Sequence, residues 1–218
     1  MRIRVKICCI NSISEAKTAV ELGADSIGLV AIMPSGPGPI PDELIYQIAQ
    51  SVPPSIGTFL LTSETSAEEI IKHHIRTHTN TIQIVDELTA GTYSRIKEAL
   101  PSVKIVQVIH VIDSKSVDLA IGISENVDAL LLDSGNPKLA IKELGGTGRI
   151  HNWSLSRKIR DNSKCPVILA GGLKPENIRE AIEAVHPFAV DVCNGVRTDG
   201  LLDRKKLRAF IRNVWDCM

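Results

Sequence analysis

Aromatic residues are scarce in this chain of 218 residues: three Phe, two Tyr and two Trp make up 3% of it. So few rings do not favour the stacked platform with which proteins bind single-stranded nucleic acid. The chain also lacks net charge, because 25 basic residues balance 25 acidic ones. A broad basic surface is therefore not indicated, and we expect neither a nucleic acid nor a membrane as partner.

Membrane, secretion and disulfide signals are missing too. No apolar run approaches the ~20 residues of a membrane span, and Met1 to Lys6 lack the apolar core and cleavage site of a signal peptide. The five cysteines contain no Cys-x-x-Cys pair, so neither a disulfide framework nor a zinc knuckle is indicated. We expect a cytoplasmic protein with reduced thiols and no cofactor.

Short β-rich segments alternate with helical ones along the whole chain, which is 44% apolar. The predicted strands cover 2–8, 26–32, 56–61, 81–85, 104–111, 128–133, 166–170 and 189–193. The predicted helices cover 14–23, 42–51, 67–77, 90–100, 114–121, 154–160, 174–185 and 204–215. This alternation predicts a parallel sheet, and eight units predict an α/β (β/α)8 TIM barrel as a single domain over 1–218. An open doubly wound sheet is the alternative.

The first strand carries polar side chains on one face. Because directions alternate, Arg4, Lys6 and Cys8 should point into the barrel. Cys8 would lie at the carboxyl end, where barrel enzymes place catalytic groups. Lys6 could stabilise a thiolate there by roughly one pKa unit. Alternatively, Cys8 is a small buried apolar residue. Cys9 should face the other way and be structural.

Asp133 ends the sixth predicted strand, so it is a candidate general acid or base at the barrel mouth. The alternative is an Asp that caps a turn. A long connection then reaches Trp153, and long loops on this face often cover substrate.

Glycine-bearing loops follow the last two predicted strands. Gly171-Gly172 follows the seventh, and Asn194-Gly195 follows the eighth. Barrels often bind phosphate at these two loops, through converging backbone amides and a helix N-terminus. Ordinary tight turns are the alternative.

Three histidines, His73, His74 and His78, lie in and just after the third predicted helix. Their spacing suggests a metal site, but no carboxylate or cysteine completes one. We therefore expect a solvated helix face.

Five motifs, in order along the chain, resemble those of the phosphoribosylanthranilate isomerase family of tryptophan biosynthesis. The family motifs are Lys-Ile-Cys-Gly-Ile-Thr, Leu-Leu-Asp, Gly-Gly-Thr-Gly with Trp-Ser, Ala-Gly-Gly-Leu-x-Pro-Glu-Asn and Val-Asp-Val-Ser-Ser-Gly-Val. The matching segments here are 6–11, 131–133, 145–148 with 153–154, 170–177 and 190–196. The resemblance spans nearly the whole chain.

The resemblance implies a cofactor-free barrel that performs an Amadori rearrangement of an aldose amine phosphate to a ketose amine phosphate. It implies that Asp133 is the general acid that opens the ribose ring and that Cys8 is the general base that removes the C2 proton. Phosphate would bind at Gly171, Gly172, Asn194 and Gly195. Lys6, Gln83 and Gly146 complete the expected substrate-binding residues.

The chain departs from the family where the aromatic half of the substrate would lie. Gly38 stands where the family has Arg, Val85 where it has His, His110 where it has Arg, and Arg197 where it often has Glu. Arg197, Arg149 or His110 could compensate. Losing a charged partner for a carboxylate can cost ~2–5 kcal/mol.

Two other functions therefore stay open. The chain could be an isomerase or related enzyme for another phosphorylated sugar, because Gly38 replaces Arg while the acid and base persist. It could also be a non-catalytic barrel that binds a phosphorylated ligand. A monomer and a homodimer are both compatible with the sequence.

Overall fold

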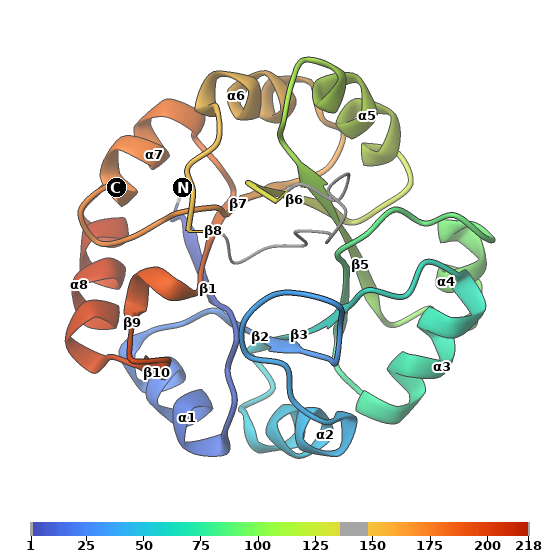
Figure 1. Cartoon of the computed structure of the whole chain (residues 1–218), viewed down its shortest axis with the longest axis horizontal. Helices are drawn as coiled ribbons and strands as arrows, with labels where there is room; N and C mark the ends of the chain where they lie inside the picture. Colours follow the sequence, from blue (N-terminus) through green and yellow to red (C-terminus); the bar gives the residue numbers. More distant parts are fainter. Residues whose placement is uncertain (1, 136–147, 218) are drawn as a thin grey trace.

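The structure, a computed structural model, describes residues 2–135 and 148–217. Eight parallel strands pair in sequence order, and β8 closes onto β1 to complete a barrel inside a ring of helices (Figure 1). The strands are β1 (Arg4–Ile7), β2 (Ser26–Val30), β3 (Gly57–Thr62), β4 (Thr81–Ile84), β5 (Lys104–His110), β6 (Ala129–Asp133), β7 (Val167–Leu169) and β8 (Ala189–Val192). The helices are α1 (Ile13–Leu22), α2 (Asp42–Ser51), α3 (Ala67–Thr77), α4 (Tyr93–Ala99), α5 (Lys115–Ser124), α6 (Trp153–Asn162), α7 (Ile178–Val185) and α8 (Arg204–Trp215). The predicted (β/α)8 barrel is confirmed.

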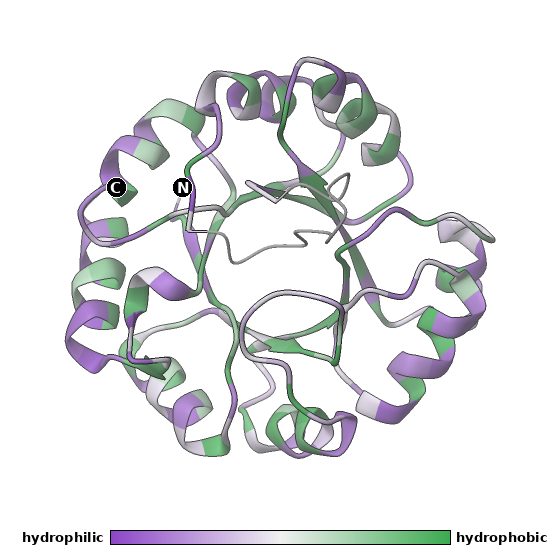
Figure 2. Cartoon of the chain, viewed as in Figure 1, coloured by the Kyte–Doolittle hydropathy of each residue, from purple (hydrophilic) through white to green (hydrophobic). Residues whose placement is uncertain are grey.

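Alternating side chains give the barrel two apolar cores. The larger core fills the layer between strands and helices, with members such as Leu60, Leu130 and Val190. The smaller one fills the barrel interior, with members such as Leu61 and Leu131. Figure 2 shows the strands as predominantly hydrophobic and the helices as striped, because each helix buries one face against the barrel. None of the described helices is long and apolar enough to cross a bilayer.

Helix ends follow local capping chemistry. Ser12 caps α1 by accepting a hydrogen bond from the Glu15 amide at 3.2 Å, so the helix begins one residue earlier than predicted. Gly23 ends α1 in the left-handed conformation, with φ 106°. Residues 174–177 form a turn, so α7 begins at Ile178, four residues later than predicted.

A short excursion follows β8 and was not predicted. One 3-10 turn, η1 (Asn194–Val196), leads into the two-residue strands β9 (Arg197–Thr198) and β10 (Leu201–Leu202), which pair antiparallel. Asp199 and Gly200 both have positive φ at the hairpin turn. Two-residue strands are too short to produce an alternating pattern, so the sequence carried no signal for them.

The predicted solvated histidine face is wrong for two of its three residues. His73 is buried, and its ring bridges Thr62 Oγ1 at 2.9 Å and Asp42 Oδ1 at 3.1 Å. His74 is buried too, and its Nε2 donates to the Thr79 carbonyl at 2.6 Å. These hydrogen bonds tie α3 to α2 and β3. Across residues 2–135 and 148–217, no group of His, Cys, Asp or Glu is arranged to hold a metal ion.

Candidate active site

A cavity of about 280 Å³ lies at the carboxyl ends of the strands, where the barrel mouth was expected to hold the chemistry. The predicted site residues that line it are Cys8, Gln83, Asp133, Gly171, Gly172, Asn194 and Gly195. Gly146 lies outside the described residues. The barrel therefore gathers side chains and backbone from five separate segments around one space.

Cys8 follows β1 at the edge of the cavity, and it is almost fully buried. The hydrogen bond from the Cys9 side chain and the positive charge of Lys6 lower the pKa of its thiol, whereas burial acts in the opposite direction. A low pKa gives more thiolate, and the thiolate is the reactive base and nucleophile.

Lys6 lies below Cys8 and forms an ion pair with Asp191 of β8 at 2.9 Å. Its side chain is 1% exposed and is not part of the cavity lining. Burial opposes its charge, but Asp191 and the nearby thiols outweigh that effect and raise the pKa of Lys6. The expected position, inside the barrel beneath Cys8, is confirmed; a direct contact with substrate has no support from this geometry.

Gly28 of β2 keeps Lys6 and Cys8 close together. A Cβ at this position would lie 2.8 Å from Cys8 Sγ and 2.9 Å from Lys6 Nζ, too close for either atom to remain in place. Because Gly28 has no side chain, the Lys6 ammonium group and the Cys8 thiol can both lie against β2 at this position.

Asp133 ends β6 and is buried. Burial raises the pKa of its carboxyl group, although the Ser134 amide, which donates to Oδ1 at 2.7 Å, acts in the opposite direction. A raised pKa keeps a proton available for donation nearer neutral pH. The carboxyl group also lies beside the glycine loop, because a Cβ at Gly171 would be 3.1 Å from Asp133 Oδ1.

The two glycine loops after β7 and β8 pack against each other. Gly171 and Gly172 have φ of 79° and 63°, a conformation that glycine adopts without strain. A Cβ at Gly195 would lie 2.0 Å from the Leu173 carbonyl oxygen, so only glycine allows this approach. Backbone amides concentrated in this way suit an anion such as a phosphate.

Gln83 projects from β4 into the opposite part of the cavity. It is buried, and its Oε1 has no hydrogen-bond partner among the described residues. A buried amide oxygen without a partner is free to accept a hydrogen bond from a ligand hydroxyl or amine.

Lys174 was missed by the sequence analysis. It lies two residues after Gly172, in the loop after β7, and is the only cationic side chain among the described residues that line the cavity. Its position directly after Gly171-Gly172-Leu173 was the available signal. Residues 35–37 of the loop after β2 also line the cavity.

Cys9 corrects a prediction. Its φ is 62°, which interrupts the alternation of an extended strand, so Cys9 lines the same cavity as Cys8 instead of facing away. The hydrogen bonds of its thiol to Cys193 and Cys8, together with burial, raise its pKa.

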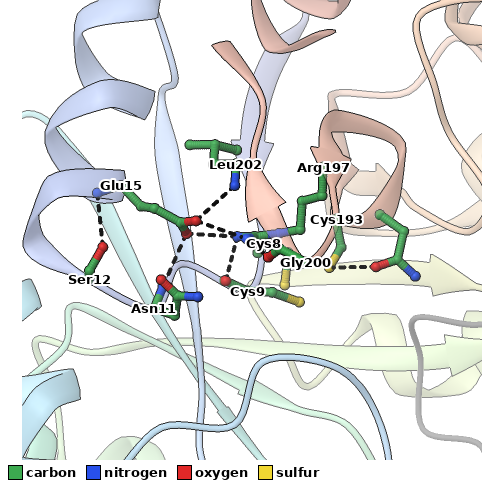
Figure 3. Close-up of polar contacts among 10 residues, drawn as sticks. Cys8, Cys9, Asn11, Ser12, Glu15, Cys193, Arg197, Gly200 and Leu202 are labelled. Carbon is green, nitrogen blue, oxygen red and sulfur yellow. Dashed lines mark hydrogen bonds and ion pairs between the residues drawn. The ribbon is translucent and has the colours of Figure 1, made fainter.

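Arg197 and His110 do not replace the missing arginine. Arg197 is buried in an ion pair with Glu15 at 2.9 Å, and it also donates to the Cys9 carbonyl (Figure 3). His110 Nε2 donates to the Val85 carbonyl at 3.0 Å. Neither side chain lines the cavity.

Gly38, at the position where Arg was expected, lies over Cys9. Its φ is 74°, and a Cβ there would be 2.9 Å from the Cys9 Cβ. The extra side chain at position 9 and the missing one at position 38 are therefore sterically linked.

Comparisons with known proteins identify the family of this chain. Residues 5–213 match the model of the family described as N-(5'phosphoribosyl)anthranilate (PRA) isomerase. The N-(5'-phosphoribosyl)anthranilate isomerase 2 of Methanosarcina mazei is 35% identical, over 97% of this chain and 94% of that protein. The phosphoribosyl anthranilate isomerase structure from Thermotoga maritima is 29% identical with a TM-score of 0.80, over 97% of this chain and 98% of that one. Another structure of such an isomerase, in complex with reduced 1-(o-carboxyphenylamino)-1-deoxyribulose 5-phosphate, is 28% identical with a TM-score of 0.77 and the same coverage.

Proposed function

The chain belongs to the N-(5'-phosphoribosyl)anthranilate isomerase family, and we propose that it catalyses the isomerisation for which the family is named, in tryptophan biosynthesis. One observation carries the proposal: a thiol with a lowered pKa and a carboxyl group with a raised pKa line one cavity that also contains two glycine loops. These are the groups that a phosphorylated aldose amine needs for an Amadori rearrangement.

The first step opens the sugar ring. Asp133 donates its proton to the furanose ring oxygen, the bond from C1 to that oxygen breaks, and the nitrogen lone pair forms a C1=N iminium. Ring oxygen is a poor leaving group, so a positioned acid lowers the barrier. Burial of Asp133, which favours the protonated carboxyl group, supports this role.

The second step moves a proton from C2. The Cys8 thiolate removes it, and the electron pair forms a C1=C2 double bond while the iminium is neutralised. The resulting enol loses its hydroxyl proton as C1 gains one, which yields the 2-ketone. No atom is lost overall. A modest base suffices, because the proton lies next to an iminium.

Gly171, Gly172, Asn194 and Gly195 would hold the phosphate through backbone amides, and Lys174 would add a charge. Gln83 would hydrogen-bond to the sugar or the amine. We expect no cofactor, a small phosphorylated substrate and a cytoplasmic location. The site residues all come from one chain, so a monomer would be sufficient, although one related structure is described as derived from a dimeric isomerase.

The test is turnover of phosphoribosylanthranilate by the purified protein, with reactant and product separated by chromatography. Cys8→Ala and Asp133→Asn should each lower kcat by about 10²–10⁴-fold. Cys165→Ala is the matched control, because Cys165 precedes β7 outside the cavity lining. Retention of full kcat in Cys8→Ala, or no rescue of a tryptophan auxotroph by the parent chain, would contradict the proposal.

A second candidate is an isomerase for another phosphorylated aldose amine, and Gly38 is the observation that favours it. The loop after β2 brings Ser35, Gly36 and Pro37 to the cavity but no cation for a carboxylate. A panel of amine-substituted ribose phosphates, with and without a carboxylate on the ring, would decide between the two. Preference for the carboxylate-free compounds supports the second candidate, and binding of all without turnover indicates a ligand-binding barrel.

A further inference from the structure

Cys9 occupies a backbone conformation that cysteine rarely adopts. Its φ of 62° lies in the left-handed region, where residues other than Gly, Asn and Asp are strained by about 1–2 kcal/mol. Glycine would adopt this conformation freely. A cysteine there therefore needs structural support, and its thiol is the group that glycine would not supply.

Arg197 supplies the support. Its Nη2 donates to the Cys9 carbonyl at 2.5 Å and to the Cys8 carbonyl at 3.5 Å. Glu15 neutralises the guanidinium, with contacts of 2.9 and 3.0 Å. Figure 3 shows the two side chains meeting behind the Cys8–Cys9 turn, on the side away from the sulfur atoms.

Glu15 is itself fixed by backbone amides of two segments. It accepts hydrogen bonds from the Leu202 amide at 2.9 Å and from the Asn11 amide at 3.3 Å. Arg197 and Glu15 together form a clamp that joins the segment after β1 to β10. It holds two successive carbonyl groups, and so it fixes the backbone orientation of Cys9.

Gly38 leaves space for the Cys9 side chain. Its lack of a Cβ is required, because that atom would lie 2.9 Å from the Cys9 Cβ and 3.4 Å from the Cys9 Cα. Backing by Arg197 and the space at Gly38 together direct the Cys9 side chain into the cavity, where it packs in the same interior cluster as Cys8.

Three sulfur atoms gather as a result. Figure 3 shows the thiols of Cys8, Cys9 and Cys193 close together, and all three residues line the cavity. Cys193 directs its own proton to Asn194 Oδ1 at 3.6 Å. Of the three, Cys8 is the one that also faces the ammonium group of Lys6 at Gly28, so it is the one favoured as a thiolate.

We propose that Cys9 is a positioning residue: its S–H donates a hydrogen bond to the Cys8 sulfur and so holds Cys8 as a thiolate, while Arg197 and Glu15 hold Cys9 in place. The proposal rests on the proposed role of Cys8 as the general base. The opposite directions of the two pKa shifts, down for Cys8 and up for Cys9, agree with a donor that keeps its proton beside an acceptor that has lost it.

The test measures the Cys8 thiolate directly, by the rate of iodoacetamide alkylation between pH 5 and pH 9 with the modified peptide identified by mass spectrometry. Cys9→Gly removes the thiol and relieves the backbone strain, so the fold should be retained. Alkylation of Cys8 at pH 7 should fall about three- to tenfold in this variant. Cys9→Ser keeps an O–H donor and should recover part of the rate, whereas Cys165→Ala should match the parent.

An unchanged alkylation profile in Cys9→Gly would overturn the inference, and the same profile with a lower free energy of unfolding would assign Cys9 a merely structural role. Turnover of the same variant is a separate measurement. Slower alkylation with a matching fall in kcat and an unchanged KM supports the proposal. Slower alkylation with unchanged kcat overturns the role of Cys8 as base but leaves the hydrogen bond from Cys9 intact.

Arg197→Met is the second variant, and urea unfolding first establishes that it folds. Loss of the carbonyl clamp should lower the Cys8 alkylation rate in the same direction as Cys9→Gly. Arg197→Lys retains one donor and should fall between Arg197→Met and the parent. Equal rates in all three proteins would exclude Arg197 from positioning the thiols.

Discussion

Lys6 and Asp191 form the most deeply buried charge pair among the described residues, at 1% and 7% exposure of their side chains. Removing both charges from water costs several kcal/mol, and their attraction at 2.9 Å offsets that cost. The pair therefore adds little net stability by itself. The pair keeps the positive charge of Lys6 beside Cys8 in the barrel interior.

Asp191→Asn should be strongly destabilising, because the Lys6 ammonium loses its counter-charge in the barrel interior. We expect the free energy of unfolding in urea to fall by about 3–5 kcal/mol. The matched control is Lys72→Met, which breaks an ion pair with Glu69 whose side chains are 62% and 52% exposed. That variant should change stability by at most about 0.5 kcal/mol. Equal effects of the two variants would contradict the buried pair's importance.

The burial of His151 predicts that the free energy of unfolding of the protein depends on pH. Burial lowers its pKa to about 4, below the 6.5 expected of a histidine in the unfolded chain. The unfolded state therefore binds the proton first as pH falls, and stability is lost from about pH 6.5 down to about pH 4. Between pH 7 and pH 5 this should amount to about 1–2 kcal/mol, allowing for partial exposure.

The measurement compares urea unfolding of the parent chain and His151→Asn at both pH values. The variant lacks the titrating ring, so its loss of stability between pH 7 and pH 5 should be smaller by that amount. The same loss in both proteins would show that other groups account for the whole acid effect.

The environments of single residues also show which side chains could be placed from the sequence and which could not. Cys8, Lys6 and Asp133 could be placed because strand alternation and strand ends are local properties. Cys9 could not, since one left-handed residue reverses the alternation. His73 and Arg197 could not either, because their partners Asp42 and Glu15 lie 31 and 182 residues away along the chain.

At the scale of elements, the side of the cavity proposed to bind phosphate depends on two loops that touch. The loop after β7 and the 3-10 turn η1 meet where Gly195 lies against the Leu173 carbonyl group. Glycines in the sequence indicated both loops, but not that the loops pack on each other. That contact comes from the neighbouring positions of β7 and β8 in the barrel.

Gly195→Ala should push these loops apart, because its Cβ would lie 2.0 Å from the Leu173 oxygen. We expect KM to rise at least tenfold and the free energy of unfolding to fall by about 1–3 kcal/mol, as for other overpacked sites. Steady-state kinetics and urea unfolding measure the two effects. Gly122→Ala is the control, since Gly122 is exposed in α5 with open space around it. It should be neutral or stabilise by up to about 1 kcal/mol.

At the scale of the whole molecule, the barrel is a ring without edges. β1 pairs with β2 on one side and with β8 on the other, so every strand has two neighbours. The fold class could be predicted because eight alternating segments leave few other arrangements. The extra hairpin β9–β10 could not, although it carries the Leu202 amide that fixes Glu15.

A chain that stops after Val185 should fail to form a cooperative structure. It leaves β1 and β7 without the neighbour that closes the ring, and it leaves Lys6 and Glu15 without Asp191 and Arg197. We expect no sigmoidal transition in urea monitored by circular dichroism, against a clear one for the full chain. A transition with the full chain's denaturant dependence would show that seven units are sufficient.

Ring closure also sets an order in time. A ribosome makes Lys6, Cys8 and Glu15 at the outset, but their partners Asp191 and Arg197 emerge only after the eighth strand has been translated. Until then the nascent chain holds a lysine and a cysteine turn without these partners, and the proposed site is incomplete. If Cys8 and Asp133 act as proposed, activity is expected only after the eighth strand has been translated.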